Sequence, residues 1–117
     1  MTAVAGLDWA TEKHDVLICD LAGRKLAERI VTHTEAGMRE LCELLIAHQV
    51  AHVAIERPDG LLIDRLSAAG IAVMAIHPNQ VKAARPRFSA AGGKSDRFDA
   101  MVLCELARTD AHRFRLI

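Results

Sequence analysis

The sequence predicts an α/β protein in which a mixed sheet of five strands carries helices on its faces. Three observations support this prediction. The chain begins with three strand-like stretches: a short apolar run at 3–9, an alternating stretch at 14–20 and a third stretch at 25–33. From residue 34 onward, apolar residues at helical spacing alternate with short, continuous apolar runs. The length of 117 residues suits a single domain over residues 1–117. The predicted order is β-β-β-α-β-α-β-α-α, a meander followed by βαβ units.

The first three strands form the predicted antiparallel meander. Residues 3–9 make a short buried strand, in which Gly6 allows another backbone to approach closely. Residues 14–20 make the second strand. The turn Leu21-Ala22-Gly23-Arg24 then leads into a third strand over residues 25–33.

Helical spacing begins after the meander. Thr34 is a suitable N-cap for a helix that continues to about residue 48. Residues 53–57 follow as a short buried strand. The next helix spans residues 58–69, opens with a Pro-Asp pair and ends at Gly70, which suits the C′ position.

The last third of the chain completes the pattern. Residues 71–76 form a continuous apolar strand, typical of the middle of a parallel sheet. A short helix begins at residue 78, and Pro86 is expected to terminate or kink it. Residues 89–95 are expected to form a Gly-containing loop, and a final helix is expected over residues 96–109.

The composition favours a packed globular chain and disfavours some functions. Hydrophobic residues make up 51% of the chain, and aromatic residues only 3%, which disfavours a base-stacking platform for single strands. Fifteen basic residues balance fifteen acidic ones, so the net charge points to no polyanionic partner. Three scattered cysteines fit buried free thiols in a reducing compartment. With no signal peptide or membrane-length apolar run, we expect a cytoplasmic protein without membrane contact.

Four carboxylates lie where such side chains are costly to desolvate. Asp8 interrupts the apolar run of the first strand, and Glu56 ends that of the fourth. Asp96 and Asp99 lie three residues apart in the first turn of the last helix and so share a face. If the strand ends and this turn meet, the four carboxylates could hold two divalent cations for phosphoryl transfer. Hard oxygen ligands favour Mg²⁺ or Mn²⁺.

Each carboxylate also has a simpler interpretation. Asp96 is a suitable N-cap, and Asp99 is a favourable acid in the first turn of a helix. Asp8 could equally belong to a turn, and Glu56 could be a solvated strand end. Spacing alone leaves metal binding and these structural roles about equally supported.

Four segments resemble the amino-terminal domain of insertion-sequence 110 (IS110) family transposases, a family that includes the Piv-type DNA invertases. They occur in the family's order and spacing over essentially the whole chain, and the last is the most specific. The segments are Gly6-Leu7-Asp8, Val53-Ala54-Ile55-Glu56, His77-Pro78-Asn79-Gln80-Val81-Lys82 and Lys94-Ser95-Asp96-Arg97-Phe98-Asp99-Ala100. The resemblance implies a ribonuclease H-like, RuvC-like domain, in agreement with the predicted strand order.

The resemblance also implies a function and its residues. It places Asp8, Glu56, Asp96 and Asp99 in a DEDD tetrad that is catalytic and holds Mg²⁺ or Mn²⁺, as two ions. It implies DNA transposition or site-specific recombination, in which phosphodiesters are cleaved and rejoined, with DNA, a guide (bridge) RNA and a homo-oligomer as partners. Family members carry a nucleophilic serine in a carboxy-terminal domain that is absent here, so we expect the truncated chain to be inactive alone. Trp9, which departs from the family pattern, is expected to shield the site.

Five cations lie within sixteen residues, with no acid among them before Asp96: Lys82, Arg85, Arg87, Lys94 and Arg97. Beside an acidic metal site, they form a candidate strip for the phosphates of DNA or guide RNA. A solvated helix face and loop would explain them nearly as well.

Two classes of function stay open at this point. One is the catalytic domain of a transposase, and the other is a non-catalytic nucleic-acid-binding or oligomerisation module derived from one. A sugar-kinase or actin-like ATPase shares the Gly-x-Asp opening, but it needs a second lobe that 117 residues do not provide. Of the six histidines, only His48 and His52 have metal-ligand spacing, and they straddle a helix–strand boundary, so structural or surface roles are expected for all six.

Overall fold

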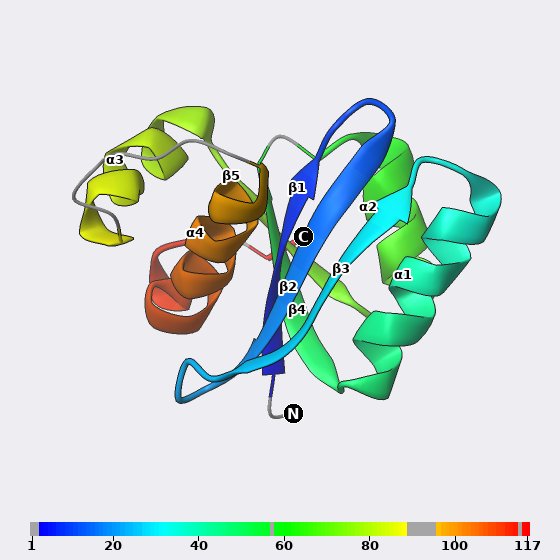
Figure 1. The fold of residues 1–117 in the computed structure, drawn as a ribbon, viewed down its shortest axis with the longest axis horizontal. Coiled ribbons are helices and arrows are strands. Elements are labelled where there is room, and N and C mark those ends of the chain that lie inside the picture. Colours follow the sequence, from blue (N-terminus) through cyan, green and yellow to red (C-terminus); the bar gives the residue numbers. More distant parts are fainter. Residues whose placement is uncertain (1–2, 57, 89–95, 115) are drawn as a thin grey trace.

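One mixed sheet of five strands separates two pairs of helices (Figure 1). The computed structural model describes residues 3–56, 58–88, 96–114 and 116–117, and the side chain of residue 96 lies outside this part. The elements are β1 (Ala3–Trp9), β2 (Lys13–Asp20), β3 (Lys25–Thr32), α1 (Glu35–Ala47), β4 (Val50–Glu56), α2 (Gly60–Ala68), β5 (Ala72–Ile76), α3 (Pro78–Phe88) and α4 (Asp96–Thr109), with a short 3-10 helix at Ala111–Arg113.

The strand order is β3-β2-β1-β4-β5, so β1 lies at the centre of the sheet. It pairs antiparallel with β2 and parallel with β4, and Leu7 lies opposite both Val16 and Ile55. Strands β2 and β3 complete the antiparallel meander, and β5 runs parallel to β4. The predicted mixed sheet, with a meander followed by βαβ units, is confirmed.

Alternation along β1 divides the core into two parts. Leu7 and its even-numbered neighbours point to opposite faces because successive side chains in a strand alternate. The first core, which includes Leu7, Ile18 and Leu41, lies under α1 and α2. The second, which includes Val4 and Leu103, lies under α3 and α4. Figure 1 shows these two helix pairs on opposite faces of the sheet.

The predicted cap at Thr34 is present, and Asp59 caps the next helix. Thr34 accepts a hydrogen bond from the backbone N–H of Gly37, and Asp59 accepts one from Leu62. Gly70 follows α2 with a φ of +82°, as the C′ position requires. The side chains of Thr34 and Asp59 thus accept hydrogen bonds from backbone N–H groups that would otherwise lack partners at the start of a helix.

Several predicted boundaries differ from the observed ones by one or two residues, and the start of β4 differs by more. Strand β4 begins at Val50, three residues before the predicted start at residue 53. Gln49, with a φ of +55°, ends the α1 region and turns the chain directly into the strand. Of the two effects expected of Pro86, termination does not occur, since Pro86 lies inside α3 and the helix continues to Phe88. The loop predicted at 89–95 lies outside the described residues.

The last residues of the chain return to the sheet, which the sequence did not indicate. Leu116 forms an isolated antiparallel bridge with Met74, and the backbone N–H of Ile117 donates to the carbonyl of Val73 at 2.8 Å. The tail thus adds to the exposed edge of β5. Within the described ranges, the structure contains no helix of the length and hydrophobicity needed to cross a membrane.

Candidate functional site

Two of the predicted acidic residues lie at neighbouring strand ends. Asp8 is the next-to-last residue of β1, and Glu56 is the last residue of β4. Because Leu7 pairs with Ile55 in parallel register, the residues that follow them leave the sheet at the same edge. Asp8 shares the parity of Val4, and Glu56 shares that of Ala54, two members of the core beneath α3 and α4. Both carboxylates therefore lie on the α3–α4 face of the sheet.

Helix α4 brings a third carboxylate to this face. Gly6 lets α4 approach β1 closely, because a Cβ atom at this position would collide with the backbone of Ala100 and Cys104. The close approach expected at Gly6 is confirmed. Asp99 lies directly before Ala100 in the first turns of α4 and is half-buried. The tight contact between β1 and α4 thus fixes the position of Asp99 relative to Asp8.

Arg85 of α3 is the cation at this site. Its Nε and Nη2 atoms donate hydrogen bonds of 2.9 and 3.1 Å to the two carboxylate oxygens of Asp99. These hydrogen bonds raise the pKa of the Arg85 guanidinium, and the negative charges of Asp99, Glu56 and Asp8 add to the rise. Three carboxylates from three elements therefore act on one guanidinium group.

The sequence did not point to another carboxylate at this edge, Asp15. It lies directly opposite Asp8 in the β1–β2 register, and in an antiparallel pair opposite residues point to the same face. The alternation of apolar and polar residues in β2 could have revealed it, because Asp15 has the same parity as Leu17 and Cys19. Two like charges in register destabilise a sheet unless a cation lies nearby.

The donor chemistry at this edge fits a divalent cation. The nearby carboxylates offer only hard oxygen atoms, as Mg²⁺ and Mn²⁺ prefer, and the guanidinium of Arg85 shows that the site accommodates positive charge. Among the described side chains, no three of the His, Cys, Asp and Glu residues are grouped closely enough to hold a metal ion. Asp96, the remaining member of the predicted tetrad, begins α4, but its side chain lies outside the described part.

The five predicted nucleic-acid-binding cations do not form one row of unpaired charges. Arg97 pairs with Glu28 at 2.9 Å, and Arg87 pairs with Asp110 at 3.3 Å. These two pairs lie near opposite ends of α4, about 20 Å apart at the rise of a helix. Lys82 is exposed on α3, whereas Lys94 lies outside the described residues.

Trp9 points away from the carboxylates, so the expectation that it shields the site is wrong. It packs against the core beneath α1 and α2, because it follows Asp8 and strand side chains alternate. Its ring stacks on buried His14 with centroids 3.5 Å apart. His14 accepts a hydrogen bond from the Ala10 N–H through Nδ1, and its Nε2 lies 3.0 Å from Nδ1 of His33. Burial, together with the charge of His33, lowers the pKa of His14 to about 4.

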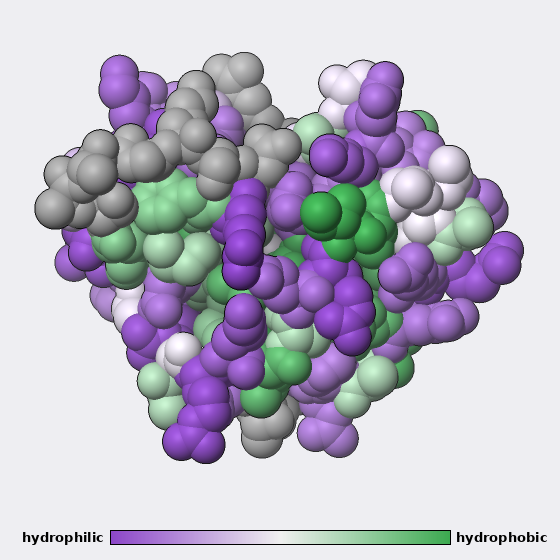
Figure 2. Space-filling view, viewed as in Figure 1, coloured by the Kyte–Doolittle hydropathy of each residue, from purple (hydrophilic) through white to green (hydrophobic). Residues whose placement is uncertain are grey.

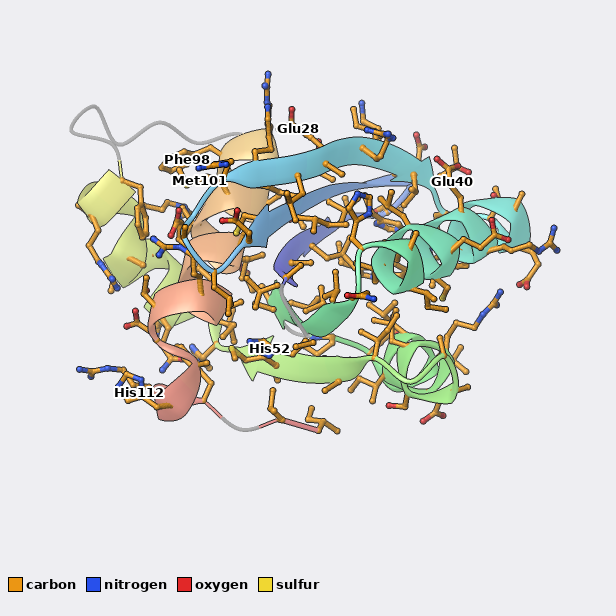
Figure 3. The ribbon with its side chains drawn as sticks, turned by 90° about the horizontal axis from the view of Figure 1, so that it is seen from below. Glu28, Glu40, His52, Phe98, Met101 and His112 are labelled. Atoms are coloured by element: carbon orange, nitrogen blue, oxygen red, sulfur yellow. The ribbon has the colours of Figure 1, made fainter. Side chains whose placement is uncertain are left out.

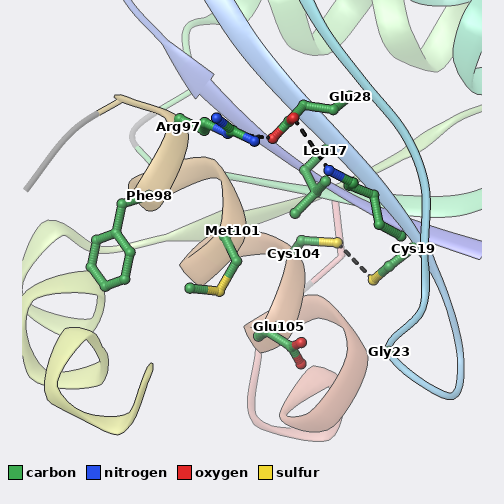
Figure 4. A pocket seen from close by; sticks show the side chains of 10 residues that line it. Leu17, Cys19, Gly23, Glu28, Arg97, Phe98, Met101, Cys104 and Glu105 are labelled. Carbon is green, nitrogen blue, oxygen red and sulfur yellow. Dashed lines mark hydrogen bonds and ion pairs between the residues drawn. The ribbon is translucent and has the colours of Figure 1, made fainter. Parts of the chain in front are cut away.

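A separate groove of about 430 Å³ lies between the β2–β3 hairpin and α4. Figure 4 shows Cys19 and Cys104 close together at this groove, with their sulfur atoms 2.8 Å apart. It also shows Glu28 beside Arg97, with which it forms an ion pair. The hydrogen bond with Cys19 and burial raise the pKa of the Cys104 thiol. All three cysteines are buried and free, as predicted. Among the predicted carboxylates whose side chains the structure describes, Asp8, Glu56 and Asp99 do not line this groove.

The surface around α3 and α4 is mixed in character. Figure 2 shows moderately hydrophobic residues gathered over these helices and hydrophilic residues across the neighbouring strands. Phe88, Phe98 and Met101 are partly buried against the second core, and Figure 3 shows Phe98 and Met101 on the same helix.

His52 joins β4 to α4 through a 3.0 Å hydrogen bond with the carbonyl of Ala107. This is a structural role, as predicted.

Comparison with known proteins gives a consistent result. A profile of the DEDD transposases of the IS110 type, described as "Transposase", matches residues 5–117. The transposase relative y4uE of Sinorhizobium fredii is 41% identical over 119 residues, which cover 97% of this chain and 33% of the relative. The mini-circle transposase relative for IS117 of Streptomyces coelicolor is 38% identical over 120 residues, which cover 98% of this chain and 29% of the relative. The chain thus spans about a third of the length of these curated relatives.

Among solved structures, the fold resembles RuvC of T. thermophilus, a protein solved in complex with a Holliday junction substrate. The TM-score is 0.72, the sequence identity is 16%, and the match covers 100% of both chains. The predicted RuvC-like, ribonuclease H-like fold is therefore confirmed.

Proposed function

We propose, because this chain belongs to the IS110 family of DEDD transposases, that its acidic site binds two Mg²⁺ or Mn²⁺ ions and acts on DNA phosphodiesters in transposition or site-specific recombination. The observation that carries the proposal is the Arg85 guanidinium, a cation that Asp99 of α4 holds by two hydrogen bonds on the face of the sheet where Asp8 of β1 and Glu56 of β4 also lie. A site that attracts a cation through oxygen atoms alone has the donor chemistry that hard divalent ions require.

In this proposal, each acidic residue has a role that follows from its element. Asp8 and Glu56 offer oxygen ligands from adjacent strand ends, and Asp96 and Asp99 offer them from the first turn of α4. When bound, the metal ions would supply activation of the attacking oxygen and stabilisation of the leaving oxygen. Strands β1 and β4 and helix α4 would keep the carboxylates in place during this reaction, because all three are packed into the core.

DNA is the proposed substrate, and Lys82, Arg87, Lys94 and Arg97 are proposed to contact its phosphates. A guide RNA and a homo-oligomer are further proposals from the family. Since the chain spans about a third of its relatives, the complete recombination reaction and the expected serine nucleophile also belong to the proposal. We expect the chain alone to bind metal but not to recombine DNA.

Calorimetric titration with Mn²⁺ tests the metal site. We expect Asp8→Asn, Glu56→Gln and Asp99→Asn each to weaken Mn²⁺ binding by about tenfold or more, since even partners of metal ligands contribute that much. Glu35→Gln is the matched control, because Glu35 lies on α1, on the opposite face of the sheet, where it pairs with Arg65. Circular dichroism would verify that each variant is folded.

The titration also separates the two classes of function. Equal weakening by Glu35→Gln, or no Mn²⁺ binding by the folded chain, would contradict the metal site. Either of these results would instead favour a non-catalytic module that binds nucleic acid or another protomer.

A further inference from the structure

The ion pair between Arg85 and Asp99 engages a carboxylate that the proposed metal site needs. Both oxygens of Asp99 accept hydrogen bonds from the same guanidinium, at 2.9 and 3.1 Å. The side chains of Arg85 and Asp99 are only 20% and 13% exposed. By comparison, the Arg65–Glu35 pair is 36% and 68% exposed. The Arg85–Asp99 pair is therefore shielded from water, where a bidentate geometry stabilises an ion pair most.

A divalent ion and this guanidinium compete for the same negative charge. An ion that approaches the two Asp99 oxygens from the side of Arg85 would replace at least one of the two hydrogen bonds that the guanidinium donates to them. The two cations also repel each other strongly at short range in a partly desolvated site. Simultaneous occupation is thus unfavourable, whereas either cation alone offsets the charges of Asp8, Glu56 and Asp99.

The position of Arg85 allows it to leave. It is near the end of α3, three residues before Phe88, and Pro86 directly after it has no backbone N–H to hold this turn in the helix. The long arginine side chain can also swing outward without movement of the helix, since it has several rotatable bonds. Asp99, in contrast, is fixed by the packing of α4 against Gly6.

We propose that Arg85 is a built-in counter-ion that occupies the carboxylate site of the metal-free protein, and that metal binding displaces it from Asp99. This inference rests on the proposed function, because it concerns the same site. It changes the role predicted for Arg85 from the sequence, where it was one of several phosphate contacts. Arg85 instead regulates access of the metal to Asp99 and is a positioning residue, not a catalytic one.

Two measurements on the same chain test the displacement. The first follows the Nε–H resonance of Arg85 by NMR during titration with diamagnetic Mg²⁺, with the resonance identified by its loss in Arg85→Lys. We expect a protected signal without metal, because the Nε–H is hydrogen-bonded to Asp99, and a shifted or rapidly exchanging signal at saturation. The second compares Mn²⁺ affinity by calorimetry in the unmodified chain, Arg85→Gln and the control Arg65→Gln.

We expect Arg85→Gln to bind Mn²⁺ about tenfold more tightly, because the competing ion pair is lost; a gain of this size would correspond to an ion pair formed in about 90% of the molecules. Arg65→Gln should bind as the unmodified chain does. An Arg85 resonance that is unchanged at saturating Mg²⁺, or an Arg85→Gln affinity equal to or weaker than that of the unmodified chain, would overturn the displacement while leaving the metal site intact. Absence of Mn²⁺ binding in every protein would overturn both the displacement and the proposed function.

Discussion

Replacement of Gly6 by alanine would force helix α4 away from the strand that carries Asp8. A Cβ atom at residue 6 would lie well inside 3.0 Å of the Ala100 carbonyl oxygen and of the Cys104 backbone nitrogen, and 2.9 Å from the Cys104 Cα. Ordinary contact begins at 3.4 Å, so α4 would have to retreat by about 1 Å in a core that is close-packed. No side-chain rotation can relieve these clashes, because the atoms belong to the backbone of one helix.

The expected cost of Gly6→Ala is at the upper end of the range for overpacking, about 3 kcal/mol of the free energy of unfolding. For a domain of this length, each kcal/mol lowers the melting temperature by roughly 3–6 °C, so we expect a decrease of roughly 10–15 °C. Thermal and urea unfolding followed by circular dichroism would measure it. Mn²⁺ affinity should also fall, because Asp99 moves with α4 while Asp8 stays on β1.

Gly60→Ala is the matched control for this substitution. Gly60 begins α2, and a Cβ atom there would have nothing within 4 Å. Alanine should stabilise this helix by about 0.5–1 kcal/mol, because it reduces the freedom of the unfolded chain. A Gly6→Ala protein as stable as the unmodified chain, with unchanged Mn²⁺ affinity, would refute the view that the α4–β1 contact positions the site.

Two contacts outside the site also have measurable consequences. The pKa of His14 is about 4 in the folded chain and 6.5 in the unfolded chain. As the pH decreases, the unfolded chain is therefore protonated at a higher pH than the folded chain. The contribution of His14 to stability is therefore complete above pH 6.5 and falls by about 2 kcal/mol between pH 7 and pH 5. Urea unfolding at both pH values should show this loss in the unmodified chain and in His112→Gln, whose histidine is exposed, but less of it in His14→Gln. Thr34→Ala should cost about 1 kcal/mol through loss of the cap on Gly37, and Thr34→Ser, which keeps the hydroxyl, should cost much less in the same assay.

The sequence was informative wherever a local pattern determines the structure. Short apolar and alternating stretches predicted the meander, and the cap at Thr34 followed from its side chain. Gly6 indicated a close approach because a glycine inside an apolar strand otherwise weakens it. The start of β4 was harder to predict, since His52 interrupts the apolar run and its partner, the Ala107 carbonyl, is distant in the chain.

The site depends on tertiary contacts, which the periodicity of apolar residues in the sequence does not reveal. Strand order placed Asp8 and Glu56 at one edge, but no spacing rule identifies Arg85 as the arginine that faces Asp99 across two helices. Arg85 and Arg87 look equivalent in sequence, and only the packing of α3 on α4 separates their partners. The burial of His14 was likewise hidden, because a histidine in a strand of mixed polarity resembles a surface residue.

The charge of this domain is balanced overall but not locally. Fifteen acidic residues match fifteen basic ones, yet the α3–α4 face of the sheet carries Asp8 opposite Asp15 in β-register, with Glu56 and Asp99 also on this face. Such a group of carboxylates lowers the stability of the sheet by mutual repulsion unless a cation lies among them. Arg85 supplies such a cation through its ion pair with Asp99. In the displacement that we propose, a divalent ion would take over this role, so a cation would offset these carboxylates whether or not the metal is bound.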